Sequence, residues 1–478
     1  MNPFELHPER LSTTDETGRR VYLYTADVKG KFRSRRTVVQ VVLLAVFLGL
    51  PWVTIGGRQA LLLDVSRREF EIFGLSLRAH NTPLLFLVLA ALGFGLFFVT
   101  AIWGRVWCGW ACPQTVFIDG VFRRIERWIE GPALERRKLA RDPLSFKKLW
   151  KLTAKWTLFS AASLIITHSF LAYFVGTERL AKMISSSPLQ NWESFLFILV
   201  TTGIVLFDFA WFREQFCTII CPYGRFQSIL MDSHSTVVAY DEKRGELRAT
   251  PQAKALAKTH GRTLGDCVNC YRCVQVCPVG IDIRRGTQME CIACTACIDA
   301  CDDVMTKVGK PTGLIRYDSE ISLKGRTRKK WRPRSLAYAG VSLSSLLALF
   351  VFASATQKID VLVLRAKEVP YTIVGNGESQ MVHNHFKLEL SNQTAEDAKL
   401  DFQLSESDRV EGIQLITAIR PLPLASGEMK RADIFIRFPA TVIKDGVKKV
   451  NLQVLNRVTS EVEVDRIEKE MTLVGPLN

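Results

Sequence analysis

Eight of the chain's twelve cysteines lie in one short segment and divide into two runs with the same spacing. The first run is Cys267, Cys270, Cys273 and Cys277, and the second is Cys291, Cys294, Cys297 and Cys301. Three cysteines on a CxxCxxC loop can hold three irons of one [4Fe–4S] cube. The spacing therefore predicts two [4Fe–4S] clusters and requires this segment to fold as loops around them.

The fourth cysteine of such a run ligates the other cube. The expected ligands are Cys267, Cys270, Cys273 and Cys301 for one cluster, and Cys277, Cys291, Cys294 and Cys297 for the other. Two structural zinc sites are the alternative, because zinc also binds four thiolates supplied by CxxC pairs. That interpretation leaves the third and fourth cysteine of each run without a role. The chain is therefore predicted to carry single electrons.

Hydrophobic residues make up 48% of the 478 residues and concentrate in five stretches. Each stretch is close to the roughly 17–25 residues that a transmembrane helix needs. The predicted spans are Thr37–Gly56, Thr82–Trp103, Trp156–Gly176, Ser194–Phe212 and Leu336–Ala353.

The net charge of +16 is distributed unevenly between the loops. Residues 104–155 carry 12 Lys or Arg against 5 Asp or Glu, whereas the loop 177–193 is neutral. Basic loops remain on the cytoplasmic side of a membrane. We therefore expect a multi-pass membrane protein, with its cysteine-rich segment in the cytoplasm and its C-terminal domain in the periplasm or outside. The basic residues adjoin helix ends, which argues against nucleic-acid binding.

Five regions follow from these patterns. We expect an N-terminal tail over 1–36, a membrane region over 37–239, a ferredoxin domain over 240–320, a basic linker with the fifth helix over 321–357, and a β domain over 358–478. Alternating polar and apolar residues in the last region predict strands at Met381–Leu390, Lys399–Leu404, Arg431–Phe438 and Lys449–Arg457. Short strands at such spacing are typical of an immunoglobulin-like β-sandwich.

The remaining four cysteines form two copies of a CxxxCP pattern. Cys108 and Cys112 follow the second span, and Cys217 and Cys221 follow the fourth. Residues i and i+4 of a helix share a face, so each pair can present two thiolates to one soft metal ion. Pro113 and Pro222 are expected to break the helix beside them. Copper, another cofactor and a reversible disulfide are all compatible with these thiols.

Three weaker candidates lie elsewhere. His168 is an ionisable residue inside the third span, where a haem, quinone or copper role competes with a plain hydrogen bond to a neighbouring helix. Asp208 near the end of the fourth span is expected to pair with Arg105 or Arg213. In the C-terminal domain, Met381, His383 and His385 alternate on a predicted strand and could form a copper set on one face.

The order of all these parts resembles the CcoG/RdxA/FixG family of cytochrome oxidase accessory proteins. Paired CxxxCP ends, the dicluster insert, the fifth span and the exported domain carry the resemblance over nearly the whole chain. It implies a cupric reductase that supplies Cu(I) for assembly of a cbb3-type oxidase, with two [4Fe–4S] clusters held by the eight cysteines. A copper-related role would then belong to Cys108, Cys112, Cys217 and Cys221.

The same resemblance implies partners as well as chemistry. Membrane lipid, a cytoplasmic electron donor of unknown identity, and oxidase subunits or copper chaperones are expected to interact with the chain, and two copies of it could associate. A quinol-linked electron carrier is one alternative, because related membrane polyferredoxins share the CxxxCP ends, and a bound quinone or redox-active haem would favour it. A non-enzymatic assembly scaffold, whose exported domain binds oxidase subunits, is the other.

The charge distribution makes a testable prediction about topology. A reporter fused after residue 360 should be active only if it is of a type that works outside the cytoplasm, since five spans separate that point from the N-terminus. Fusion of a reporter of each type measures this directly. Cytoplasmic activity at that position would mean that one span has been miscounted.

Overall fold

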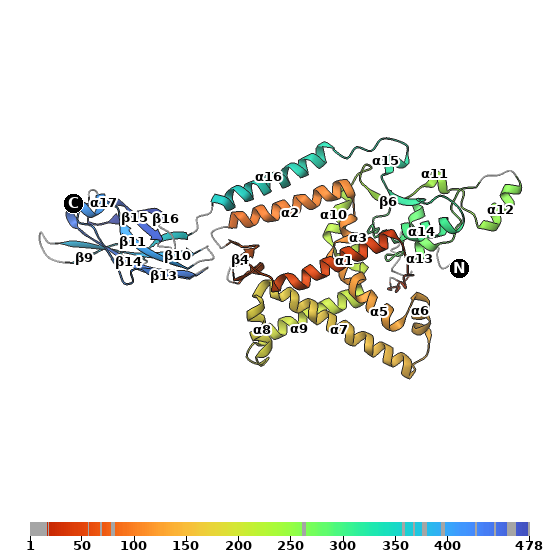
Figure 1. The fold of residues 1–478 in the computed structure, drawn as a ribbon, viewed down its shortest axis with the longest axis horizontal. Helices are drawn as coiled ribbons and strands as arrows, with labels where there is room; N and C mark the ends of the chain where they lie inside the picture. Colours follow the sequence, from red (N-terminus) through yellow and green to blue (C-terminus); the bar gives the residue numbers. More distant parts are fainter. Residues whose placement is uncertain are drawn as a thin grey trace. The chain divides into compact units, whose positions relative to one another are not determined.

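Two structural units divide the chain, Met1–Val351 and Phe352–Asn478, and each is described by itself (Figure 1). The computed structural model describes residues 17, 19–55, 57–66, 69–77, 82–260, 264–355, 359–366, 369–374, 380–392, 397–425, 428–443, 446–456 and 465–476.

Five helices in the described part of the chain are long and apolar enough to cross a membrane, as predicted. They are α1 (Lys31–Gly49), α2 (Thr82–Trp103), α7 (Phe146–Val175), α9 (Trp192–Leu206), whose candidate span continues to Phe212, and α16 (Pro333–Ala355). Only 11% of the apolar window of α9 and of α16 is buried in protein. Outward-facing Leu, Val and Phe side chains on this scale fit a lipid environment.

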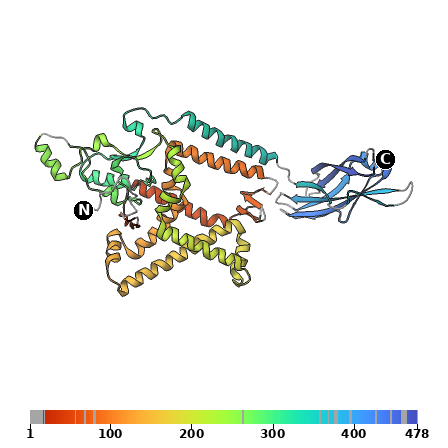
Figure 2. The same ribbon diagram turned by 180° about the vertical axis from the view of Figure 1, so that it is seen from behind.

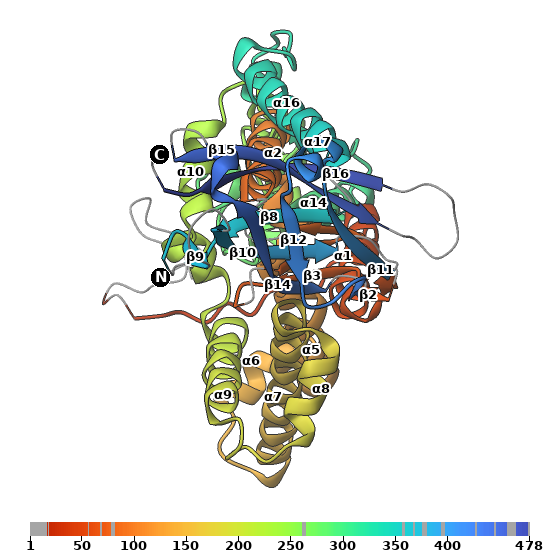
Figure 3. The same cartoon turned by 90° about the vertical axis from the view of Figure 1, so that its left-hand side faces the viewer.

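The membrane helices form two pairs with α1 between them (Figure 3). In the first pair α2 and α16 lie side by side (Figures 1 and 2), where Ser342 Oγ donates to Ala91 O at 3.0 Å. In the second pair α7 packs against α9. Helix α1 joins this second pair through Tyr173, whose hydroxyl donates to Phe47 O at 2.8 Å.

Short elements between α1 and α2, which the sequence patterns did not predict, form a two-stranded sheet and a separate three-stranded sheet. The elements are η1 (Leu50–Trp52), β1 (Thr54–Ile55), β2 (Arg58–Gln59), β3 (Leu61–Asp64), β4 (Glu69–Ile72) and β5 (Leu75–Leu77), with β1 and β2 in the first sheet and the order β3-β4-β5 in the second. The three-stranded sheet lies at the end of α7 and beside α8 (Thr177–Ser185), where Arg179 Nη1 is 3.2 Å from Asp64 Oδ2.

The opposite ends of α2 and α9 lead into broken helical segments. After α2 these are α3 (Val106–Trp110), α4 (Pro113–Phe117), η3 (Ile118–Phe122), α5 (Arg123–Glu130) and α6 (Ala133–Arg141). After α9 they are η4 (Phe207–Phe212), η5 (Phe216–Ile220) and α10 (Pro222–Leu230). Each set contains one CxxxCP pattern.

The cysteine-rich segment is closed by two strands from its ends. β6 (Val237–Tyr240) pairs antiparallel with β7 (Ile315–Asp318), so that Val237 lies opposite Asp318. Between them lie α11 (Glu242–Gly245), α12 (Pro251–Thr259), α13 (Arg272–Gln275), η6 (Ile283–Arg285) and α14 (Ala296–Lys307), and α15 (Glu320–Leu323) follows.

The N-terminal segment differs from the expected tail. Helix α1 starts at Lys31, and its first turn is capped by the Asp299 carboxylate, which accepts from Arg33 N at 2.7 Å. Tyr22, upstream of the helix, donates to Glu126 Oε1 at 2.8 Å. The described residues from 19 to 36 therefore pack against the rest of the unit, because their polar groups form hydrogen bonds with segments far along the chain.

The second unit is the expected β-sandwich. One sheet contains β8 (Ile359–Arg365), β9 (Thr372–Val374), β10 (Met381–Asn392), β12 (Gln414–Thr417) and β14 (Met429–Pro439). The other contains β11 (Ala398–Leu404), β13 (Leu422–Leu424), β15 (Val447–Asn456) and β16 (Asp465–Val474), and short α17 (Glu406–Val410) and η8 (Ala440–Val442) join strands. Phe402, Leu388 and Ile436 are fully buried between the sheets. The four predicted strands correspond to β10, β11, β14 and β15, with Arg457 outside the described residues.

Candidate functional site: two cysteine-lined cavities and four further thiols

The eight cysteines of the two runs surround two adjoining cavities. Cys267, Cys270, Cys273 and Cys301 line the first. Cys277, Cys291, Cys294 and Cys297 line the second, with Cys273 at its border. The fourth cysteine of each run thus lies with the first three of the other run. The structure brings together each of the two predicted sets of four.

The loops that carry these cysteines share an unusual backbone conformation. Asn269 and Tyr271 flank Cys270, and Ala293 and Thr295 flank Cys294 at the equivalent positions. All four flanking residues have positive φ, at 52°, 54°, 53° and 65°. A positive φ is unfavourable for residues that have a side chain. A residue keeps this strained backbone conformation only where the surrounding structure requires it. The repeated pattern indicates that both loops are shaped around a bound group.

The electrostatics of the thiols match a multi-iron group. Burial raises the pKa of Cys273 to about 12 and that of Cys291 to about 11. Without a cation the thiols are therefore neutral at ordinary pH, and the positive charge of bound iron would favour the thiolate form.

The two cavities differ in their surroundings. Cys270 of the first cavity is exposed to solvent. The second cavity is enclosed by an apolar cluster that contains Val279, Ile281 and Ile292, and the partly buried Cys108 and Cys217 pack against that cluster. One cavity thus adjoins solvent, and the other adjoins the CxxxCP segments.

Both CxxxCP segments have the same local geometry. Cys112 N donates to Trp107 O at 2.9 Å, and Cys221 N donates to Phe216 O at 2.8 Å. These i to i−5 bonds are π-type turns, which are frequent at functional sites. α4 begins at Pro113 and α10 at Pro222, so the predicted helix breaks are confirmed.

The four CxxxCP thiols converge. Burial, followed by the neighbouring Cys112, Glu214 and Cys108, raises the pKa of Cys217 far above its usual value. Burial also raises the pKa of Cys108 to about 11, although a hydrogen bond from Gln227 Nε2 to its Sγ, at 3.1 Å, acts in the opposite direction. Four sulfurs this close disfavour ionisation of one another, and a soft cation would remove that penalty.

The first CxxxCP segment lies directly against the second cavity's loop. A Cβ added at Gly109 would lie 2.6 Å from both Ile292 O and Ala293 O, so the backbones approach as closely as glycine allows. Arg105 reaches across to the same loop by donating to Met289 O, and it also donates to Gly224 O at 2.8 Å. These contacts fix the first thiol pair relative to the ferredoxin domain.

A left-handed residue precedes each thiol pair at the equivalent position. In the first copy it is Gly104, with φ of 60°, where an added Cβ would lie 2.2 Å from Thr236 O. In the second copy it is Arg213, with φ of 53°. Arginine tolerates this conformation here because its guanidinium is held by the Glu126 carboxylate, with Nη2 at 2.5 Å from Oε1.

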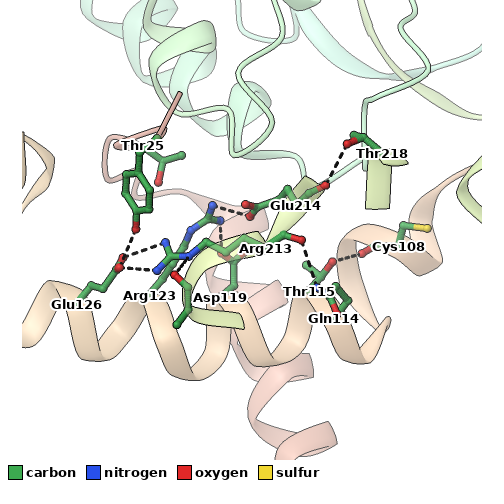
Figure 4. A network of polar contacts seen from close by, with 12 residues as sticks. Thr25, Cys108, Gln114, Thr115, Asp119, Arg123, Glu126, Arg213, Glu214 and Thr218 are labelled. Atoms are coloured by element: carbon green, nitrogen blue, oxygen red, sulfur yellow. Dashed lines mark hydrogen bonds and ion pairs between the residues drawn. The ribbon is translucent and has the colours of Figure 1, made fainter. Parts of the chain in front are cut away.

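The Arg213–Glu126 pair belongs to a buried ion network that joins the two copies (Figure 4). Arg123 bonds Asp119 at 2.7 Å and Glu214 at 2.5 Å. Arg36 also bonds Asp119, and Arg136 reaches Glu126 at 3.1 Å. Apart from Arg213, which was expected to pair with Asp208, these residues were not among the sequence-based candidates. The spacing of Asp119, Arg123 and Glu126 on one helical face was the signal that could have indicated them.

The network holds its carboxylates ionised. The pKa of Asp119 is lowered because Arg36, Arg123 and Arg33 outweigh the effect of burial. The pKa of Glu126 is likewise lowered to about 2 by Arg213 and its hydrogen bonds, against burial. Both carboxylates stay charged at ordinary pH, as the buried guanidinium groups require.

Several contacts join the network to the thiol segments. Gln114, next to Cys112, donates from Nε2 to Asp208 Oδ1 at 2.9 Å and to Arg213 O at 3.3 Å. Thr115 Oγ1 donates to Cys108 O at 2.6 Å (Figure 4). The expected pairing of Asp208 with Arg105 or Arg213 is therefore wrong, because the Arg213 side chain is already bonded to Glu126 and Arg105 points to the ferredoxin loop.

The weaker candidates have local partners. His168 Nδ1 lies 2.8 Å from Leu164 O of its own helix. In the β-sandwich, His385 Nε2 lies 2.8 Å from Asp433 Oδ1, and the His385 ring stacks on Phe435 with centroids 4.4 Å apart. Met381, His383 and His385 do share one face of β10. Their metal-binding roles stay predictions.

Three regions of the chain match known families. Residues 212–320 match the 4Fe-4S dicluster domain, and residues 84–132 match a 4Fe-4S binding domain. Residues 349–476 match the IG-like fold at the C-terminal of FixG. The second of these matches contains Cys108 and Cys112.

Whole-chain relatives agree with these matches. Protein RdxA of Cereibacter sphaeroides is 35% identical over 401 residues, which cover 80% of this chain and 81% of RdxA. Nitrogen fixation protein FixG of Rhizobium meliloti is 32% identical over 450 residues, which cover 86% of this chain and 83% of FixG. Protein RdxB of Cereibacter sphaeroides is 34% identical over 420 residues, covering 84% of each chain.

Apolar helices of membrane-spanning length, a dicluster fold and converging thiols define a membrane-bound iron–sulfur electron-transfer protein. Similarity to these relatives over most of the chain, together with the C-terminal family match, shows the family to which the protein belongs. The chain belongs to the CcoG/RdxA/FixG family.

The ion network generates a prediction about stability. Glu126→Gln should destabilise the membrane unit by about 3–5 kcal/mol, because it leaves buried guanidinium groups uncompensated. Thermal unfolding of the purified full chain at neutral pH measures this, with the exposed Glu135→Gln as control. Because the folded pKa of Glu126 is lowered, its stabilisation is present above about 4.5 and is lost as the pH falls toward about 2. Equal stability of the two variants would contradict a structural role for the network.

Proposed function

We propose that this protein is a cupric reductase that transfers electrons through two [4Fe–4S] clusters to Cu(II) at the CxxxCP thiols. The observation that carries this proposal is the packing of Cys108 and Cys217 against the apolar cluster around the second cysteine-lined cavity. An electron acceptor bound at those thiols would be a near neighbour of the second cluster.

The cluster ligands follow from the lining of the two cavities. We assign Cys267, Cys270, Cys273 and Cys301 to the first cluster, and Cys277, Cys291, Cys294 and Cys297 to the second. Thiolate-only sets of four suit iron–sulfur cubes. The crossed fourth cysteines, Cys277 and Cys301, support this assignment over two independent sites.

The exposure of the cysteines supports a direction for electron transfer. The first cluster adjoins solvent at Cys270, so a soluble donor can reach it. The second cluster is enclosed and lies between the first cluster and the CxxxCP thiols. Electrons would therefore enter at the first cluster and leave from the second.

Each transfer to copper is a one-electron step. Cu(II) gains one electron and becomes Cu(I), while a donor of one electron is oxidised in turn. The chain's own contribution is to supply soft thiolates, which favour Cu(I) over Cu(II), and to exclude water by burying them. Protons released when Cys108 and Cys217 ionise would pass to solvent, since burial alone keeps both thiols neutral.

Family membership supports the biological setting. The product Cu(I) would pass to copper chaperones or oxidase subunits for assembly of a cbb3-type cytochrome oxidase. The basic loops support placing the ferredoxin domain in the cytoplasm and the immunoglobulin-like domain in the periplasm, where it could contact such partners.

One observation favours a second candidate role for the CxxxCP thiols. The family match over residues 84–132 is to a 4Fe-4S binding domain and includes the first pair. Four converging sulfurs could hold a further iron–sulfur cluster in place of copper. The protein would then be an electron carrier whose final acceptor lies elsewhere.

The cluster assignment predicts the iron content. Purified protein should contain about eight irons per chain, because each cube has four. Cys270→Ser should remove the signal of one cluster and leave much of the other, as electron paramagnetic resonance of the reduced protein can measure. Zinc without iron after anaerobic preparation would overturn the assignment.

The role of the CxxxCP thiols can be tested separately. A Cys217→Ser, Cys221→Ser variant should keep its cluster spectrum, yet lose or slow Cu(II) reduction and bind Cu(I) less tightly. A Cu(I)-specific chelator measures reduction by cluster-reduced protein, and the exposed Ile219→Val between the cysteines is the control. Loss of iron in the double variant would favour a further cluster, and unchanged reduction would contradict both roles.

A further inference from the structure

A large basic cavity lies beside the second cluster site, and none of the four CxxxCP thiols lines it. Its volume is about 650 Å³, within the usual size range of small-molecule sites. Residues from 25 to 37, including the first turns of α1, form one wall. Helix α5, Asp119 of η3 and Arg136 of α6 form another, and the two loops that carry Pro278 and Cys294 form the third.

Positive charge dominates the lining of this cavity. Six arginines and one lysine face Asp27 and Asp119 as the acidic members. Asp119 is already bonded by Arg36 and Arg123, and Asp27 pairs with Arg127 at 3.4 Å. Arg124 lines the same cavity and has no ion pair within the described part of the chain. Glu214 and Glu126, outside the lining, also pair with Arg123 and Arg136, and the cations of the lining still outnumber these carboxylates.

Membrane topology does not account for all of this charge. The positive-inside rule concerns basic residues exposed near the ends of membrane helices. Arg36 and Arg136 are only 2% and 6% exposed. Arg136 bonds Glu126 and Thr25 O, yet its buried Nε has no hydrogen-bond partner in the described structure. A buried donor left without an acceptor is costly, so a hydrogen-bond acceptor supplied by a ligand would stabilise it.

We propose that this cavity binds a phosphate group. Guanidinium groups match phosphate oxygens in pairs of parallel hydrogen bonds and are the side chains most used for this purpose. An acidic protein surface is a weaker fit, since a hollow of this volume admits a small ligand group more readily than a broad protein face. The phosphate can come from a soluble phosphorylated compound or from an anionic lipid headgroup, because α1 enters the apolar span at the same place.

The position of the cavity links the phosphate to electron transfer. Cys294 and Pro278 line it, and both belong to the loops assigned to the second cluster. This link rests on the proposed function. A bound anion would disfavour the added negative charge of the reduced cluster, so its reduction potential should become more negative when phosphate binds.

The test uses the full chain with its clusters, in nanodiscs of zwitterionic lipid, and measures binding of radiolabelled inorganic phosphate by equilibrium dialysis. Arg124→Gln with Arg127→Gln removes two cations of the cavity. Arg141→Gln with Lys147→Gln removes two exposed cations outside it and is the matched control. A parallel series replaces part of the zwitterionic lipid with phosphatidylglycerol and measures thermal unfolding.

Saturable phosphate binding that weakens about tenfold or more in the cavity variant, and not in the control, is the expected result. Stabilisation by phosphatidylglycerol alone, with the same dependence on Arg124 and Arg127, would identify a lipid headgroup as the source. The proposal would be overturned if neither phosphate binding nor stabilisation by phosphatidylglycerol were observed. It would also be overturned if the cavity variant and the control variant lost phosphate binding equally. Binding is measured without copper, so the proposal and the cupric reductase activity can fail independently.

Discussion

The buried arginine–carboxylate network is the interaction on which the rest of the membrane unit depends. It joins α1, the helices after the first CxxxCP pair and the turn before the second, through Asp119, Glu126 and Arg213. Charges removed from water are tolerated only when each has a partner. The network therefore restricts how these segments can be arranged, and in that arrangement Cys108 and Cys217 both pack against the apolar cluster of the ferredoxin domain.

This arrangement separates two kinds of chemistry around the second cysteine-lined cavity. Soft sulfur lies on one side, where Cys108 and Cys217 pack against Ile292 and its apolar neighbours. Cationic guanidinium groups lie on the other side, where Arg36 and Arg123 line the basic cavity. The same arginines take part in the network, so the groups that position the thiols also shape the basic cavity. The second cysteine-lined cavity therefore has the CxxxCP thiols and the arginine side chains as neighbours.

Internal repetition gives the site much of its form. The two cysteine runs share left-handed residues around Cys270 and Cys294, and the two CxxxCP segments share π-type turns at Cys112 and Cys221. The two CxxxCP segments differ where their neighbouring residues differ. Gly104 is required because Thr236 O approaches it closely, whereas Arg213 adopts the same conformation with the support of Glu126.

Local spacing in the sequence determined the cysteine sets, the five apolar spans, the proline breaks and the main strands of the sandwich, because each depends on neighbours a few residues apart. Which side chains pair with one another when they lie far apart in the sequence was decided only by the tertiary structure. Asp208 lies 94 residues from Gln114, and Arg213 lies 87 from Glu126, so no local pattern could show which arginine meets which carboxylate. The packed N-terminal segment and the basic cavity also became visible only there, since both arise where distant segments bury charge together.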